Sequence, residues 1–196
     1  MSLRILSYGH QLLREKCEKA DHDFLDWGTL IDDMWETLSK TGACGLSASQ
    51  INLPVNLFVV DSRSFYQSLP AEERHLYFEE SEGIHETFIN ARIINRSMRT
   101  WVDFEGCLSI PGISERVERP WDITIEYLDR SFIQKRQTYS GMDARIIQHE
   151  YDHSQGILYL DHLKPVRRKI LDNKLQQIAS GQVPTMYPMV YPENPQ

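Results

Sequence analysis

The chain has no run of about 18 apolar residues, so we expect no transmembrane helix. Its first residues, MSLRILSYGH, lack the apolar core and cleavage site of a signal peptide, and we expect a cytoplasmic protein. Cysteines are few, at positions 17, 44 and 107, and an odd number argues for free or metal-bound thiols rather than a disulfide framework. The net charge of −7 argues against a basic nucleic-acid-coating surface, and we expect no specific DNA binding.

The composition is that of one ordinary globular domain. Of 196 residues, 41% are hydrophobic and 25% are charged, and a chain of this length can bury a sizeable core. We find no internal repeat. We therefore interpret residues 1–196 as a single domain whose last part, 182–196, is a proline-rich tail.

Hydrophobic spacing predicts three helices. Residues 24–42 carry apolar side chains at the helical period, and Gly42 is placed to end the helix. A second helix is predicted over 142–156. A third is predicted over 165–181, with Pro165 near its first position.

Strand-like runs lie between and around these helices. Alternating or β-branched residues predict strands over five segments: 55–61, 87–94, 122–129, 132–140 and 157–161. Residues 61–87 are acidic and predict an irregular surface loop with one helical turn. The segment 105–114 is rich in turn residues, and the tail is predicted to be neither helix nor strand. Strands that precede and flank separate helices predict the α+β class.

The segment IIQHEYDHSQG carries His149 and His153 four residues apart. On a helix this spacing places both imidazoles on one face, where they can reach one cation. Glu150 then lies about 100° around the axis, where a carboxylate can take a proton from water. A solvated helix that matches this short pattern by chance is the alternative. The apolar flanks favour a buried helix whose polar groups need partners, and a metal is the simplest partner.

A catalytic metal site needs a third protein ligand and an open position. The downstream candidates are Asp161, His162 and the acids of the C-terminal helix, but none completes an extended zinc-protease pattern. Upstream, Cys107 lies between turn-forming residues that can aim a thiolate at one point. A cysteine that only fills the core is the alternative for Cys107.

Three segments, in this order, resemble the motifs of the peptide deformylase family: CGLSASQ (44–50), EGCLS (105–109) and QHEYDH (148–153). The similarity extends from about Ile5 to Ile178, and three ordered motifs are far more specific than two histidines alone. The resemblance implies an α+β fold with antiparallel sheets around a central helix that carries HEYDH, and a C-terminal helix. It also implies a metal-dependent hydrolase that removes the formyl group from N-formyl-methionine on new polypeptides and releases formate.

The resemblance further implies roles for individual residues at the metal. Cys107, His149 and His153 match the family's metal ligands, and Glu150 matches its general acid/base. Fe(II) is the metal expected in the native enzyme, with Zn(II) or another divalent metal as the alternative in the isolated protein.

On the substrate side, the Gln50 amide and the backbone N–H of Leu108 match the donors to the formyl oxygen as it becomes an oxyanion. Gly45 is the expected backbone contact to the substrate, because a residue without Cβ lets two backbones approach closely. Three residues are candidates for the methionine pocket, with ordinary core packing as the alternative: Cys44, Met142 and Ile146.

Other residues of these motifs have expected supporting roles. Glu105 is expected to orient the EGCLS segment, and Arg145 to pair with an acid such as Glu105 or Asp152. Asp152 either supports the metal site or is an exposed helix charge. The first motif departs from the family pattern, since Ala43 replaces a glycine and Ser47 an alanine. These changes bear on rate and substrate range, and no ligand position is lost.

Two other interpretations stay open. A zinc endopeptidase could use the same histidines and Glu150 with a downstream third ligand, which would leave Cys107 idle. A deformylase-like protein could also hold a metal or an N-terminus with little turnover, and the altered first motif is the argument for it.

The expected partners are nascent N-formyl-methionyl polypeptides and, through residues 163–180, the ribosome. Five basic residues face one acid in this segment: Lys164, Arg167, Arg168, Lys169 and Lys174. On a helix they can form a stripe, while four apolar residues pack inward or flank it: Ile170, Leu171, Leu175 and Ile178. In the family the C-terminal helix is associated with ribosome docking. A solvated amphipathic helix is the alternative.

Overall fold

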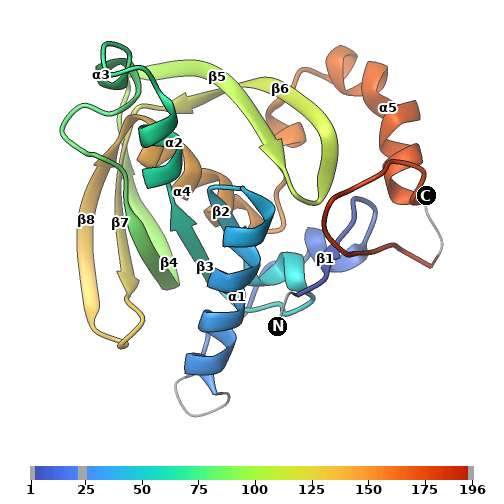
Figure 1. The fold of residues 1–196 in the computed structure, drawn as a ribbon, viewed down its shortest axis with the longest axis horizontal. Coiled ribbons are helices and arrows are strands. Elements are labelled where there is room, and N and C mark those ends of the chain that lie inside the picture. The colour runs from blue at the N-terminus through green and yellow to red at the C-terminus, as the bar shows by residue number, and fades with distance from the viewer. Residues whose placement is uncertain (1–2, 22–25, 194–196) are drawn as a thin grey trace.

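The computed structural model describes residues 3–21 and 26–193. Phe24 and Leu25, at the start of the first predicted helix, lie outside the described residues, as do the last three residues of the tail. The described residues form these elements, in chain order (Figure 1): β1 (Ile5–Leu6), η1 (Gln11–Arg14), α1 (Trp27–Thr41), β2 (Gly45–Ser47), η2 (Ala48–Ile51), β3 (Leu57–Asp61), α2 (Arg63–Ser68), α3 (Arg74–Tyr77), β4 (His85–Arg96), β5 (Thr100–Cys107), β6 (Ile110–Pro120), β7 (Asp122–Leu128), β8 (Gln134–Ser140), α4 (Gly141–Ser154), η3 (Tyr159–His162), α5 (Pro165–Ala179) and β9 (Met189–Val190).

A five-stranded sheet has the order β2-β3-β4-β7-β8, and every neighbouring pair is antiparallel. Four of the predicted strands are confirmed within it, with shifted ends: 55–61, 87–94, 122–129 and 132–140. Buried residues alternate with half-buried ones along β7, because only one face of the sheet is covered by the core. Residues of the inner face, such as Phe88 and Ile125, cluster with Ala144 and Ile147 of α4.

Helix α4 carries the HEYDH motif and is buried along nearly its whole length. It contacts β2, β3 and β8 of the large sheet and also β6 of the neighbouring hairpin. The predicted α+β fold, with antiparallel sheets around a central helix and a later C-terminal helix, is therefore confirmed. Within the described part of the chain, no helix is long and apolar enough to cross a membrane.

The segment 105–114, predicted to be rich in turns, is the end of a long hairpin instead. Strands β5 and β6 pair in antiparallel fashion along their whole lengths and arch over one side of the molecule (Figure 1). Buried and exposed residues alternate along β6, but two of the buried ones, Glu115 and Arg119, are charged. For this reason the hydrophobic pattern does not reveal the strand.

Two further predictions of local structure are wrong. Residues 157–161 are not a strand, because Oδ2 of Asp161 accepts a hydrogen bond from the backbone N–H of Leu158 at 2.9 Å and closes a 3₁₀ turn, η3. Residues 61–87 hold two short helices, α2 and α3, rather than one turn in an irregular loop. Phe65 of α2 and Tyr77 of α3 join them, with ring centroids 5.9 Å apart.

The tail, predicted to contain no strand, returns beside the N-terminal segment (Figure 1). Strand β9 pairs in parallel with β1, so that Ile5 lies opposite Met189 and Leu6 opposite Val190. The pair is only two residues long and lies among prolines, which hide it from a strand pattern. Because Ile5 and Leu6 are fully buried, the pair anchors the tail to the core.

The ends of α1 and α5 agree with the sequence prediction. Helix α1 begins after Asp26, whose side chain accepts a hydrogen bond from the N–H of Thr29, and it ends at Gly42 in the left-handed region. Helix α5 has Pro165 in its first turn and ends before Gly181, which also has positive φ.

Candidate metal centre and active site

Helix α4 and the end of β5 bring the three predicted ligands together. His149 and His153 lie one turn apart on α4, with ring centroids 5.2 Å apart. Cys107 is the last residue of β5, and its Sγ lies 3.2 Å from Nε2 of His153. One ligand atom from each of the three residues lies within 4.8 Å of the other two. Among the described residues, this is the one group of this kind that could hold a metal ion.

The donor set fits a divalent metal. Nδ1 of His149 lies 2.9 Å from Oε2 of Glu105, which leaves the other ring nitrogen, Nε2, for a metal. A thiolate with two imidazole nitrogens suits zinc or ferrous iron.

The charges at these residues favour the thiolate. Burial would raise the pKa of Cys107, but the two imidazoles beside it outweigh burial and lower this pKa to about 5. Burial would likewise lower the pKa of His149, yet Cys107 and Glu105 raise it well above its ordinary value. Cys107 therefore has the charge state that binds metals.

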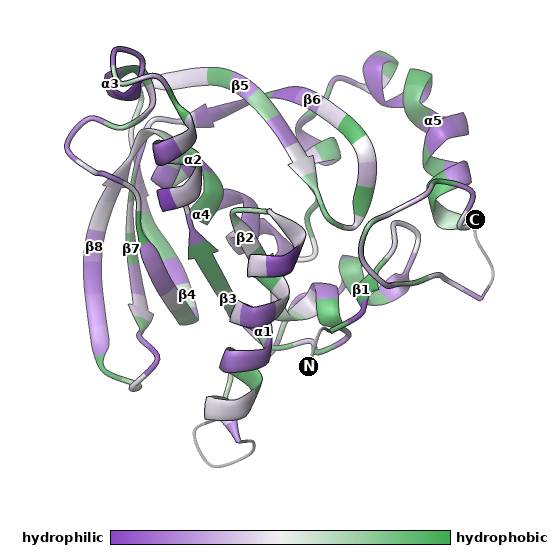
Figure 2. Cartoon of the chain, in the orientation of Figure 1, coloured by the Kyte–Doolittle hydropathy of each residue, from purple (hydrophilic) through white to green (hydrophobic). Residues whose placement is uncertain are grey.

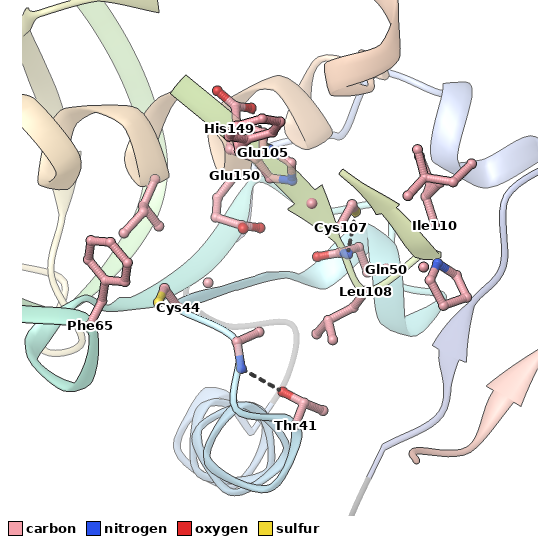
Figure 3. Close-up of a pocket in the computed structure, with 18 of the residues that line it drawn as sticks. Thr41, Cys44, Gln50, Phe65, Glu105, Cys107, Leu108, Ile110, His149 and Glu150 are labelled. Carbon is pink, nitrogen blue, oxygen red and sulfur yellow. Dashed lines mark hydrogen bonds and ion pairs between the residues drawn. The ribbon is translucent and has the colours of Figure 1, made fainter. Parts of the chain in front are cut away.

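Glu150 follows His149 on α4, and its carboxyl group lies in the cavity (Figure 3). Its Oε2 is buried and has no hydrogen-bond partner among the described residues. Burial raises the pKa of Glu150 to about 7, so this carboxyl can both take and release a proton near neutrality. Gly45 on β2 makes room for it, because a Cβ at Gly45 would collide with the Glu150 carboxylate. This contact is additional to the substrate contact predicted for Gly45.

Gln50 is fully buried and fixed in orientation. Its Oε1 accepts a hydrogen bond from the backbone N–H of Ser47 at 2.9 Å. Its Nε2 then donates to Oγ of Ser109 at 3.2 Å and to Sγ of Cys107 at 3.4 Å. The amide N–H group is therefore held beside the candidate metal ligand.

A buried ion-pair network supports the ligands. Arg145 pairs with Glu105 (2.6 Å), which decides between the two acids that the sequence left open. Arg119 of β6 binds both oxygens of Glu105, at 2.8 and 2.9 Å, and lies 2.5 Å from Oδ2 of Asp152. Asp152 is buried and also lies 2.7 Å from Nε2 of His162, so it supports the site and is not an exposed charge. Arg119 is a residue that the sequence motifs do not indicate.

One cavity of about 690 Å³ is bordered by Gln50, Cys107, His149 and Glu150. All residues predicted for the substrate line it: Cys44, Gly45, Gln50, Leu108, Met142 and Ile146. Figure 3 shows Phe65 on one side of Glu150 and Leu108 on the other. Burial raises the pKa of Cys44 to about 11, so its thiol is neutral and serves as part of the wall. Ala43 also borders the cavity, where its methyl group adds bulk.

Two parts of the cavity wall come from segments that the sequence motifs do not indicate. Phe65 and Tyr77 reach it from the helices of the 61–87 segment, which is therefore more than a surface loop. Residues 184–187 reach it from the tail. The hydroxyl group of Tyr187 donates a hydrogen bond to the carbonyl oxygen of Leu108 at 2.8 Å. Burial raises the pKa of Tyr187 to about 12, so the phenol keeps its proton.

The basic residues of α5 are partly matched by acids. Arg167 donates to Glu115 at 2.6 and 2.8 Å, and Arg168 lies 2.9 Å from Asp161. The net positive charge that α5 presents to solvent is therefore smaller than the count of its basic residues indicates.

The apolar residues of α5 divide between core and surface. Leu171, Leu175 and Ile178 are buried, as predicted. Ile170, predicted to pack inward or to flank the basic stripe, is 65% exposed, and Val166 is 75% exposed. Figure 2 shows hydrophilic and hydrophobic residues in succession along α5.

A cysteine and two histidines that could hold a metal lie beside a buried carboxyl group at this cavity, and this donor set is the one expected of a metal-dependent hydrolase. The chain matches the family described as polypeptide deformylase over residues 2–169. It therefore belongs to the polypeptide deformylase family.

Relatives and solved structures agree with this family. The chain is 38% identical over 194 residues to a peptide deformylase of Christiangramia forsetii, with 98% of this chain and 97% of the relative covered. It is 39% identical over 191 residues to one of Flavobacterium psychrophilum, with 96% of each chain covered. The crystal structure of peptide deformylase from Ehrlichia chaffeensis has a TM-score of 0.79 at 27% identity and covers 93% of this chain and 99% of its own.

The family determines the class of activity. The chain is a hydrolytic enzyme with deformylase function. The zinc endopeptidase and the binding protein with little turnover are not favoured by these findings.

Proposed function

We propose that this chain removes the formyl group from N-formyl-methionine at the start of newly made polypeptides, with a divalent metal held by Cys107, His149 and His153. One observation carries the proposal. A thiolate and two imidazoles converge within 4.8 Å beside Glu150, a buried carboxyl group with one oxygen that no described residue binds.

The metal proposed for the native enzyme is Fe(II). The thiolate of Cys107 and two imidazole nitrogens suit Fe(II) and Zn(II) alike, and Zn(II) or another divalent metal is the alternative in purified protein. When bound, the metal supplies a Lewis acid that activates water at neutral pH and polarises the formyl carbonyl.

Glu150 is proposed to move the protons of the reaction. Its free Oε2 takes a proton from the attacking water. As the C–N bond breaks, the same carboxyl group delivers this proton to the amine nitrogen of methionine, and formate leaves. A pKa near 7 supports both halves of this task.

Gln50 and Leu108 are proposed to stabilise the negative charge on the formyl oxygen. The Gln50 amide is already oriented by Ser47, and it would exchange its long contact to Sγ of Cys107 for a hydrogen bond to the formyl oxygen. The backbone N–H of Leu108 follows Cys107 directly in the chain, which places it next to a residue that would hold the metal. Loss of one such donor costs about 2.7–4 kcal/mol of barrier height.

The substrate is proposed to lie along the cavity with its backbone against Gly45. The methionine side chain would occupy the apolar wall formed by Cys44, Met142 and Ile146. Phe65 extends this wall, because it borders the same cavity.

Nascent polypeptides are the proposed substrates, and the cytoplasm is the proposed location because formylated chains are made there. A weak, salt-sensitive association with ribosomes through residues 163–180 is proposed as well. It depends on those basic residues of α5 for which the described part of the chain holds no acidic partner, such as Lys169.

Formate release from a short formyl-methionyl peptide tests the function. Anaerobic, iron-loaded wild-type protein should release formate. Glu150→Gln should retain its metal and lose most of this activity, because the amide cannot carry the proton. A fully metal-loaded wild-type protein that binds the peptide without releasing formate would contradict the proposal, as would loss of the metal from the Glu150 variant.

A further inference from the structure

The turn between β5 and β6 is held from two sides. On its inner side, Oγ of Ser109 accepts the hydrogen bond from Gln50. On its outer side, the carbonyl oxygen of Leu108 accepts from the Tyr187 hydroxyl at 2.8 Å, and that of Ser109 accepts from the backbone N–H of Tyr8 at 2.8 Å. The turn therefore depends on contacts with the N-terminal segment and the tail.

The donors of both outer hydrogen bonds, Tyr8 and Tyr187, lie next to residues that join β1 and β9. The backbone N–H of Ile5 donates to the carbonyl of Pro188 at 3.0 Å, and that of Ser7 donates to Val190 at 2.8 Å. Tyr187 immediately precedes Pro188, so the β1–β9 pair fixes its backbone. The Tyr187 ring also packs with Leu108 against the same hydrophobic core.

We propose that Tyr187 is a positioning residue for the deformylase reaction: its phenol holds the Leu108 carbonyl and so orients the Leu108 N–H toward the formyl oxygen. This inference rests on the function proposed above. The N–H and the carbonyl of Leu108 belong to the two rigid peptide planes that meet at its Cα, and fixing one plane restricts the other. Oxyanion donors act best when they are already oriented before the reaction.

Replacement of Tyr187 by Phe removes only the hydroxyl group and keeps the packed ring. We expect kcat for a formyl-methionyl peptide to fall about three- to tenfold, the effect of one neutral hydrogen bond. KM should change by less than about twofold, because the Leu108 donor acts mainly in the transition state. Metal content should stay at the wild-type level.

The matched control is Tyr191→Phe, in the same tail, where the ring lies against Gly181. Its kcat should equal that of the wild type. Hydrogen exchange of the peptide that covers the β5–β6 turn supplies a readout independent of turnover. Exchange there should rise in metal-loaded Tyr187→Phe and stay unchanged in Tyr191→Phe.

The possible outcomes separate the two proposals. An active wild type whose kcat and turn exchange are unaffected by Tyr187→Phe would overturn this inference alone. A joint fall of metal content and kcat would also overturn it, since the phenol would then act through Cys107. A metal-loaded wild type that releases no formate would overturn the proposed function and this inference together.

Discussion

Oε2 of Glu105 lies 2.9 Å from Nδ1 of His149, and two arginines hold the same carboxylate. Burial would raise the pKa of Glu105, but Arg119 and His149 outweigh burial and keep this pKa well below its usual range. A permanent negative charge therefore fixes the imidazole, so that Nε2 is turned toward the metal position.

Loss of the Glu105 charge should affect both metal binding and stability. Glu105→Gln should weaken metal affinity about 10- to 100-fold, because the imidazole loses its anionic partner. It should also lower the free energy of unfolding by about 3–5 kcal/mol, because two buried arginines lose their counter-charge. Chelator competition and urea unfolding measure these effects. Glu118→Gln, on the exposed side of β6, is the control and should change neither. Wild-type metal affinity in Glu105→Gln would show that the contact with Glu105 does not strengthen metal binding by His149.

Acid should destabilise the metal-free protein through the same carboxylate. The pKa of Glu105 is lower in the folded than in the unfolded state, so its ionised form adds stability above the unfolded value of about 4.3. This contribution is lost as the pH falls below that value toward the folded pKa. Urea unfolding from about pH 6 to pH 3 should show a steeper loss in the wild type than in Glu105→Gln. An equal loss of unfolding free energy with falling pH in both proteins would show that Glu105 is not the group responsible.

Loss of the thiolate should remove the metal. Cys107→Ala should lose bound metal and nearly all deformylase activity, because two imidazoles alone bind weakly. Cys44→Ala, in the same cavity, should keep its metal, since the Cys44 thiol is neutral and is not part of the ligand group. Metal analysis after dialysis distinguishes the two variants. Full occupancy in Cys107→Ala would assign the third ligand elsewhere.

The iron form should be sensitive to oxygen. Oxidation of Fe(II), or of the low-pKa thiolate of Cys107, ends the proposed chemistry. Anaerobic, iron-loaded protein should therefore turn over faster than aerobic, zinc-loaded protein. Formate release with each metal, in air and under nitrogen, is the measurement. Equal rates in all four conditions would contradict this prediction.

Ribosome association should depend on α5. A triple change to alanine at Arg167, Arg168 and Lys169 should weaken co-sedimentation with ribosomes at low salt and leave hydrolysis of a short peptide unchanged. The same charge change at three arginines of the large sheet is the control: Arg92, Arg96 and Arg136. Because Arg167 and Arg168 have acidic partners, Lys169→Ala alone should already weaken binding. Equal sedimentation of the α5 and control variants would leave a solvated helix as the interpretation.

The sequence predicts what depends on local spacing. His149 and His153 share a helix turn, so their juxtaposition is visible without a fold, and motif resemblance adds Cys107. Local spacing does not predict that Arg119 and Tyr187 belong to the site. Arg119 binds Glu105 from the opposite strand of the β5–β6 hairpin, and Tyr187 binds Leu108, which lies 79 residues earlier in the chain. Such contacts depend on strand register and topology, and the hydrophobic periodicity of the sequence predicts neither. The same limit explains why the β5–β6 hairpin and the β1–β9 pair were not predicted.

The β1–β9 pair has a consequence for the order in which the enzyme matures. Ile5 of β1 precedes its partner Met189 of β9 by nearly the whole of the described chain, so the pair can close only after the ribosome has released all the residues between them. Until then the Leu108 carbonyl has no Tyr187 to hold it, although both histidines and Cys107 are already present. Residues made well after both histidines therefore complete the cavity, and a growing chain that still lacks β9 cannot carry its finished active site.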